Sequence, residues 1–158
     1  MAEPLADRVI KRIGQAAELY HRLVLLVAPA GSGKTAALQD VHERTAAPLI
    51  NVNLELSLAL LDLTERQRAL HLPRLLAEIV AASAGDVVLL DNIEILFDVS
   101  LKQDPLRLLQ GLSRNKTVVA AWSGSIDGEY IGYATPDHPE YKRYPLRDFL
   151  VVNPEAVA

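Results

Sequence analysis

Apolar residues along this chain gather in short continuous runs, separated by longer stretches in which they recur at helical spacing. Such runs are typical of strands that are buried on both faces of a sheet. They cover residues 23–27, 48–53, 87–91, 117–122 and 149–152. Because the strands alternate with helices, the pattern predicts an α/β fold with a five-stranded, mainly parallel sheet sandwiched by helices.

Four helices are expected from the helical spacing of apolar residues. They cover residues 3–20, 33–45, 64–84 and 105–112. Thr64 and Gln67 have the spacing of a capping box, and Pro73 is expected to bend or restart the helix that they begin. Asp104 is the predicted N-cap before Pro105 at the first helical position.

The pattern changes after Gly124, where tyrosines and prolines are frequent. We expect an irregular hairpin over about residues 125–146 in place of another crossover helix, with its tyrosines used for local packing or an interface. A base-stacking platform is the less favoured use of these rings. At 158 residues, the chain is expected to form a single domain, residues 1–158.

Composition and charge limit the partners that this chain can have. Half of the residues are hydrophobic and 23% are charged, which is ordinary for a folded soluble protein. The net charge of −4 gives no general attraction to nucleic acid, although a local basic patch could still contact DNA. Without cysteines, disulfides and thiolate metal sites are excluded. No apolar run reaches membrane-spanning length and no signal peptide is recognisable, so a cytoplasmic location without a membrane partner is expected.

The most informative motif follows directly after the apolar run 23–27. Residues 28–35 read Ala-Pro-Ala-Gly-Ser-Gly-Lys-Thr, which is the phosphate-binding P-loop pattern with alanine in the first glycine position. Glycines allow backbone conformations in which consecutive N–H groups point at a phosphate. Lys34 supplies a cation for the β- and γ-phosphates, and Thr35 supplies a hydroxyl for Mg²⁺. The predicted nucleotide-binding residues are Ala28, Pro29, Ala30, Gly31, Ser32, Gly33, Lys34, Thr35 and Ala36.

A candidate Walker B aspartate, Asp91, ends the apolar run 87–90 at the edge where open α/β sheets bind their ligands. We expect Asp91 and Thr35 to lie on the Mg²⁺ side of the site; a plain turn aspartate is the alternative. Asn92 follows, where AAA+ ATPases have the glutamate that polarises water. A carboxamide can orient a water molecule but takes no proton at neutral pH. If the strand continues, Glu94 points to the same side and could be the base, or it caps or pairs with a cation.

Two further candidates lie at or before the fourth predicted strand. Ser123 stands at the strand end, where AAA+ and related ATPases have a polar sensor of the γ-phosphate; an ordinary strand-end serine is the alternative. The segment 102–116 is basic and could provide an arginine finger in trans, with Arg114 as first choice. A contact to DNA phosphates or a solvated surface would use the same residues. Arg143 and Arg147 are equally possible arginine donors.

Over nearly its whole length the chain resembles the BrxF family, the small P-loop proteins of type III BREX bacteriophage-exclusion systems. Besides the P-loop, the matching stretches are residues 3–10, 90–98, 112–115 and 138–145. The resemblance implies a role in phage defence beside a large BREX ATPase, a methyltransferase, a helicase and a PglZ-type protein. It also implies an AAA+-like core without a helical lid domain, so that a neighbouring subunit or partner would complete the site.

Three functions are open at this point. The first is an ATP-binding, Mg²⁺-dependent AAA+-like ATPase that acts as a homo-oligomer or within a BREX complex, with Lys34 on phosphate and Glu94 or Asn92 positioning water. The second is a nucleotide-sensing assembly module with little or no hydrolysis, which Asn92 favours. The third is a nucleoside or small-molecule kinase, which the absence of an arginine-rich lid disfavours. ATP is preferred over GTP because of the resemblance.

Overall fold

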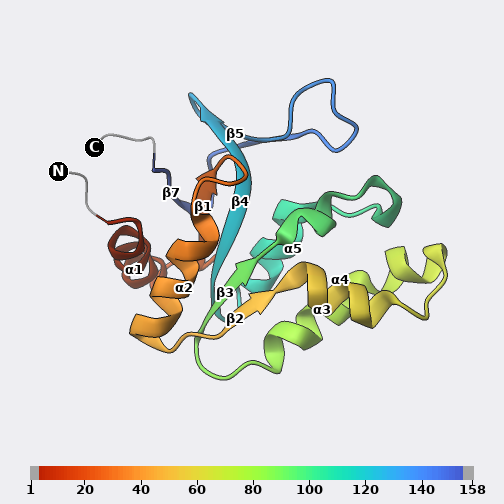
Figure 1. The fold of residues 1–158 in the computed structure, drawn as a ribbon, viewed down its shortest axis with the longest axis horizontal. Coiled ribbons are helices and arrows are strands. Elements are labelled where there is room, and N and C mark those ends of the chain that lie inside the picture. Colours follow the sequence, from red (N-terminus) through yellow and green to blue (C-terminus); the bar gives the residue numbers. More distant parts are fainter. Residues whose placement is uncertain (1–3, 155–158) are drawn as a thin grey trace.

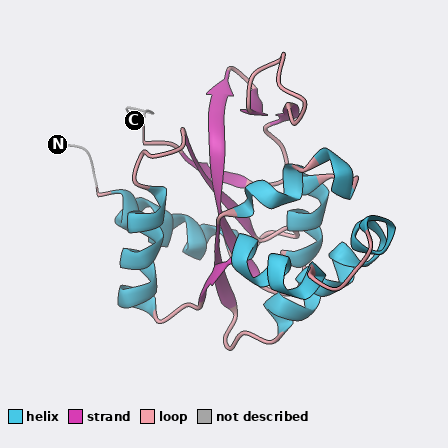
Figure 2. Cartoon of the chain, turned by 45° about the vertical axis from the view of Figure 1, so that its right-hand side comes forward, coloured by secondary structure: helices cyan, strands magenta, loops and turns pink. Residues whose placement is uncertain are grey.

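A computed structural model describes residues 4–154, and it confirms the α/β class with a mostly parallel sheet flanked by helices (Figures 1 and 2). The strands are β1 (Leu23–Ala28), β2 (Leu49–Asn51), β3 (Val87–Asp91), β4 (Thr117–Asp127), β5 (Tyr130–Tyr133), β6 (Lys142–Pro145) and β7 (Leu150–Val152). The helices are α1 (Leu5–Ala16), α2 (Lys34–Thr45), α3 (Val52–Leu60), α4 (Glu65–Ala81), α5 (Pro105–Leu112) and the 3₁₀ turns η1 (Ile93–Phe97) and η2 (Val99–Leu101).

The sheet has a parallel part and an antiparallel part. The parallel strands follow the order β2-β3-β4-β1-β7, and β5 and β6 continue from β4. The prediction of five strands is therefore wrong for the part of the chain that the structure describes, where the sheet has seven. The five predicted runs all form strands of the parallel part, and the additional strands come from the hairpin that was expected to be irregular.

Side chains of the central strands alternate between two buried cores. Val24 and Leu26 of β1 pack toward α1 and α2, whereas Leu23, Leu25 and Val27 face α3, α4 and α5. Figure 1 shows the same division, with α1 and α2 on one side of the sheet and the other helices opposite. Because β1 is buried along its whole length on both faces, its continuous apolar run is explained.

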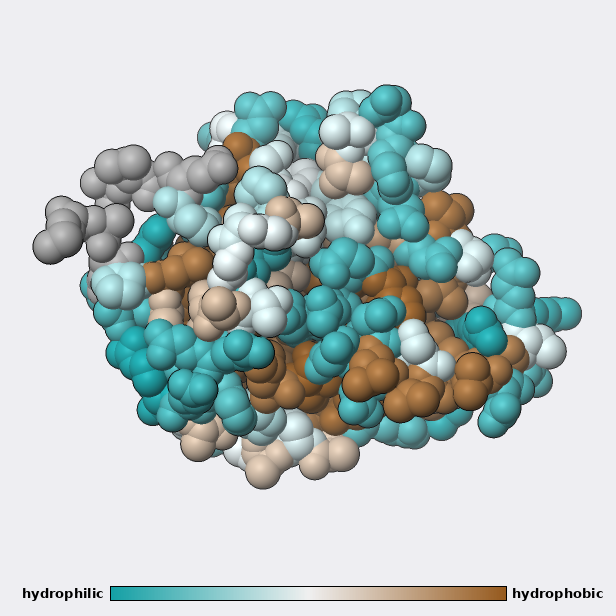
Figure 3. Space-filling view, viewed as in Figure 1, coloured by the Kyte–Doolittle hydropathy of each residue, from teal (hydrophilic) through white to brown (hydrophobic). Residues whose placement is uncertain are grey.

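The helix α3 was not predicted, and it begins where the second strand was expected to continue to residue 53. The side chain of Asn51 caps the helix by accepting a hydrogen bond from the Leu54 N–H at 3.1 Å. This cap ends β2 after three residues. Leucines cover α3 on its exposed side as well as on its buried side, so apolar atoms gather over it in Figure 3. The exposed leucines of α3, α4 and their connection are Leu54, Leu58, Leu61 and Leu70.

Other element boundaries differ only in part from the prediction. The helix expected over residues 3–20 is α1, which ends at Ala16; residue 3 lies outside the described residues. The capping box of Thr64 and Gln67 is confirmed by both of its hydrogen bonds. The helix does not restart at Pro73, because α4 runs through this residue as one element. Asp104 caps α5 as predicted.

The strand β4 runs to Asp127, five residues beyond the predicted end, and carries the hairpin out past the parallel part (Figure 2). Gly124 permits this extension, because its backbone lies against the carbonyl of Gly132 in β5. Tyrosines pack the hairpin: Tyr133 stacks on Phe97 with ring centroids 3.6 Å apart, and the Tyr144 hydroxyl donates to Asp104 Oδ1 at 2.8 Å. Local packing of these tyrosines is thus confirmed. Among residues 4–154, no helix has the length and apolar character needed to cross a bilayer.

Candidate functional site

The loop between β1 and α2 has the backbone conformation that its glycines were expected to provide. Gly31 has φ +76° and Gly33 has φ +91°, in the left-handed region that side chains disfavour. A Cβ atom at either position would meet nothing within 4 Å, so the requirement for glycine is conformational and does not come from crowding. The hydroxyl of Ser32 donates to the carbonyl of Pro29 and closes the loop on itself.

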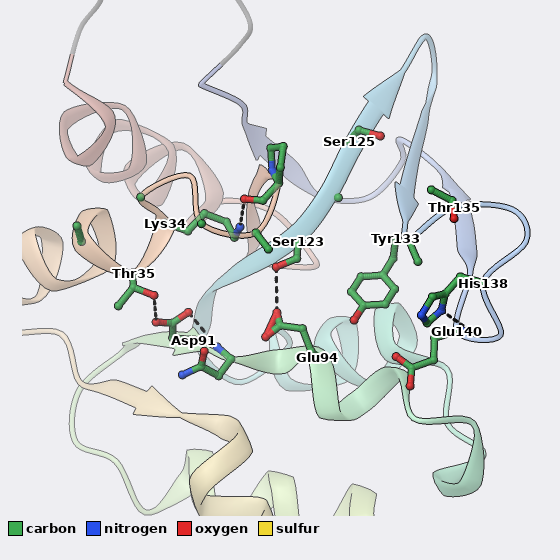
Figure 4. A pocket seen from close by; sticks show the side chains of 18 of the residues that line it. Lys34, Thr35, Asp91, Glu94, Ser123, Ser125, Tyr133, Thr135, His138 and Glu140 are labelled. Atoms are coloured by element: carbon green, nitrogen blue, oxygen red, sulfur yellow. Dashed lines mark hydrogen bonds between the residues drawn. The ribbon is translucent and has the colours of Figure 1, made fainter.

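Lys34 begins α2 and directs its ammonium group back across the loop (Figure 4). Its Nζ donates to the carbonyl oxygens of Ala28 at 2.9 Å and of Pro29 at 2.7 Å. Burial lowers the pKa of Lys34, and the nearby carboxylates of Glu94 and Asp91 partly oppose this shift. If an anion took the place of the Ala28 and Pro29 carbonyls, the Lys34 ammonium would donate to it from a partly desolvated position, which strengthens such a contact.

Thr35 and Asp91 come together although 56 residues separate them in the chain. The Thr35 hydroxyl donates to Asp91 Oδ2 at 2.6 Å, while Asp91 Oδ1 accepts from the backbone N–H of Asn92 at 2.9 Å. Oxygen ligands are those that Mg²⁺ prefers, and it binds them at about 2.0–2.1 Å, so two oxygens this close can contact one ion. The pair therefore fits Mg²⁺.

No set of three histidine, aspartate or glutamate side chains within the described part of the chain could hold a metal ion alone. A Mg²⁺ ion at the Thr35–Asp91 pair would accordingly take its other ligands from phosphate oxygens and water, as is usual for this ion.

Glu94 reaches the site by a route that differs from the expected one. The strand ends at Asp91, Asn92 has a left-handed backbone with φ 55°, and the chain continues as the 3₁₀ turn η1. The condition that the strand continues past Asp91 is therefore not met. The Oε2 atom of Glu94 nonetheless accepts a hydrogen bond from the Ser123 hydroxyl at 3.1 Å. Within residues 4–154, Glu94 forms no ion pair.

One cavity of about 1000 Å³ brings together Lys34, Thr35, Asp91, Asn92, Glu94 and Ser123 and extends beyond them to the hairpin (Figure 4). Of the predicted nucleotide-binding residues, Ala28 and Ser32 do not line it. Its wall on the loop side consists of the P-loop and the start of α2, and β3 and β4 contribute at the centre. The hairpin side is formed by Ser125, Tyr133, Ala134, Thr135, His138 and Glu140. The volume is at the upper end of the range of about 300–1,000 Å³ for small-molecule sites.

Arg114 lies away from this cavity. Its carbonyl accepts from Nη2 of Arg22, the residue just before β1, at 2.9 Å, and its guanidinium lies 5.2 Å from the centroid of the Tyr20 ring. The P-loop follows the other end of β1, so Arg114 occupies the opposite edge of the sheet. An arginine-finger role in a second subunit remains a prediction.

The other proposed arginine donors lie on the hairpin side of the molecule. Arg143 stacks 3.7 Å from the ring centroid of Tyr130, and Arg147 lines a surface pocket together with Asp104 and Tyr144. Neither of them lines the main cavity.

The hairpin side of the cavity, above all Tyr133 and Glu140, was not predicted from the sequence. These residues reach the cavity because β5 and β6 fold back antiparallel beside β4. Local sequence patterns show neither the length of β4 nor the register of this pairing.

The chain matches no protein-family profile, and no curated protein matches it.

Proposed function

We propose that this protein binds ATP with Mg²⁺ in the cavity beside its P-loop and hydrolyses it as an AAA+-like ATPase. The observation that carries the proposal is the meeting of Lys34, Thr35 and Asp91 at the carboxyl ends of β1 and β3. Open α/β sheets bind their ligands at this edge, and a loop of left-handed glycines in front of a helix N-terminus suits phosphate.

Each residue has a separate part in the proposed reaction. Lys34 exchanges its two carbonyl partners for phosphate oxygens, and Thr35 with Asp91 holds Mg²⁺. When bound, this ion neutralises charge that develops on the phosphates. Glu94 keeps Oε2 in the hydrogen bond with Ser123, which leaves Oε1 to take the proton of the attacking water. Asn92 can orient that water through its carboxamide.

A nucleotide-sensing module that binds ATP with little hydrolysis is the second candidate. The observation in its favour is Asn92, a residue that cannot take a proton, directly after Asp91. The left-handed turn at this residue also ends the strand, so Glu94 comes from η1 and not from a continued β3.

Calorimetry with MgATP tests the binding step. Wild-type protein should bind, and Lys34→Ala should weaken binding by about 10- to 150-fold, because one charge-assisted contact contributes about 1.5–3 kcal/mol. Arg66→Ala, at an exposed position of α4, is the matched control and should bind as wild type does. If folded wild-type protein binds no MgATP at millimolar concentration, the proposed function is wrong.

Hydrolysis assays then separate the two candidates. If Glu94 is the base, Glu94→Gln should lower the rate about 10²–10⁴-fold. The exposed Glu55→Gln should have no effect. An unchanged rate in Glu94→Gln would rule out the base assignment. Wild-type protein that binds MgATP but forms no ADP would instead support the sensing module.

The cellular role that we propose is phage defence as a cytoplasmic BREX component, as a homo-oligomer or with other BREX proteins. The resemblance of the P-loop and of residues 90–98 to the BrxF family supports it. In a host that carries the system, Lys34→Ala should restore phage plating, whereas Arg66→Ala should keep plating low. Equal plating for the two variants would contradict a nucleotide-dependent role.

A further inference from the structure

The cavity continues past the proposed phosphate site into a compartment on the hairpin side, of which the proposed function uses only Glu94. We define this hairpin compartment by Glu94 at its inner end and by Tyr133 and Glu140 on the hairpin. Figure 4 shows these three side chains around one space, with Ser125 and Thr135 above them. Ser125, Thr135 and His138 are exposed, so a small molecule can enter from solvent.

Tyr133 is the best-fixed group of this compartment. Its ring stacks on Phe97 at 3.6 Å with an interplanar angle of 13° and meets the edge of Trp122 at 6.4 Å. Although only 8% of the residue is exposed, its hydroxyl reaches into the cavity (Figure 4). Among the described residues this hydroxyl makes no hydrogen bond. The hydroxyl oxygen itself is open to the cavity, so a ligand in this space can reach it.

The charges around this hydroxyl are negative. Burial raises the pKa of Tyr133 to about 12, and the carboxylates of Glu140 and Glu94 add to the shift. Neither carboxylate forms an ion pair within residues 4–154. The ring of His138 is already engaged, because its Nδ1 accepts the backbone N–H of Glu140 at 3.0 Å. Lys34, the only lysine or arginine in the described cavity wall, donates to the P-loop carbonyls.

We propose that the hairpin compartment binds a small molecule that carries a guanidinium or primary ammonium group. Such a group brings several N–H donors and a positive charge. These match the Glu140 carboxylate, the Tyr133 hydroxyl oxygen and Oε1 of Glu94, whose Oε2 already accepts from Ser123. The inference of binding stands without nucleotide. Only the position of the cation next to the terminal phosphate, where it would counter phosphate charge, rests on the proposed function.

The test uses nucleotide-free full-length protein and n-butylguanidinium chloride as the probe. Trp122 is the only tryptophan of the chain and contacts Tyr133, so its fluorescence reports on the compartment. We expect a saturable change that potassium chloride at equal ionic strength does not produce. Glu140→Gln should weaken binding about tenfold or more, as expected for the loss of a charge-assisted contact.

Two further variants make the result specific. Tyr133→Phe keeps the stacked ring and should also weaken binding, while Glu129→Gln, an exposed hairpin glutamate, should bind as wild type does. The inference is overturned if no saturable change occurs, or if Glu129→Gln and Glu140→Gln weaken binding equally. MgATP binding measured on the same samples keeps this outcome distinct from failure of the proposed function.

Discussion

Replacing Gly124 with alanine should separate β4 from β5, the strand that pairs with it in the hairpin. A Cβ atom at this position would lie 1.9 Å from the carbonyl oxygen of Gly132 and 2.9 Å from Nε1 of Trp122. That carbonyl oxygen accepts the hydrogen bond of the Trp122 indole at 3.1 Å, so the new methyl group would occupy the space that the bond spans. Because the obstacle is backbone, β5 has to move away from β4.

The expected loss of stability follows from two contributions. Trp122 is fully buried, so its indole N–H would be left without a partner, which costs about 1–3 kcal/mol. Overpacking of a well-packed core costs a further amount of about 1–3 kcal/mol. We therefore expect Gly124→Ala to lower the free energy of unfolding by about 3 kcal/mol or more.

Gly132→Ala is the matched control. A Cβ atom there would meet only the Lys142 carbonyl oxygen, at an ordinary contact distance of 3.8 Å. Alanine also has fewer unfolded conformations than glycine, so this variant should be as stable as wild type or up to about 1 kcal/mol more stable.

Urea unfolding followed by Trp122 fluorescence measures both variants. With an m-value of about 2 kcal/mol/M, a loss of about 3 kcal/mol lowers the unfolding midpoint by about 1.5 M. Detachment of the hairpin alone would instead appear as a red shift of the native emission, because Trp122 would contact water. If Gly124→Ala has the midpoint and the native emission of wild type, the steric account of this position is wrong.

Three other predictions concern a helix cap and the candidate site. Thr64→Ala removes the acceptor of the Gln67 N–H and should lower the free energy of unfolding by about 1 kcal/mol in urea titrations. Thr35→Val removes the hydroxyl next to Asp91, so calorimetry should show that ATP binding needs an Mg²⁺ concentration about tenfold higher. Thr35→Ser, which keeps a hydroxyl, should largely restore the wild-type value. Since burial lowers the pKa of Lys34, ATP affinity should fall with rising pH already below 10.5; constant affinity up to that pH would contradict this.

Much of the fold and the glycine conformation of the loop at residues 28–35 could be predicted because their causes are local. The conformation of Gly31 and Gly33 and the cap at Thr64 depend on contiguous residues, and burial on both faces makes strand runs uniformly apolar. The helix α3 was not predicted, for two reasons. Its leucines lie on all sides, so the helical spacing of apolar residues is hidden. In addition, its N-cap Asn51 had been assigned to the preceding strand.

Residues 28–35 carry their own turn chemistry, so their order was enough to place a glycine turn between a buried strand and a helix. Contacts over longer separations depended on how the sheet pairs. Thr35 meets Asp91 across 56 residues and Ser123 meets Glu94 across 29, and both pairings require the observed strand order. The hairpin wall with Tyr133 arises because Gly124 lets two backbones approach closely, and a one-residue slip would turn that ring away from the cavity.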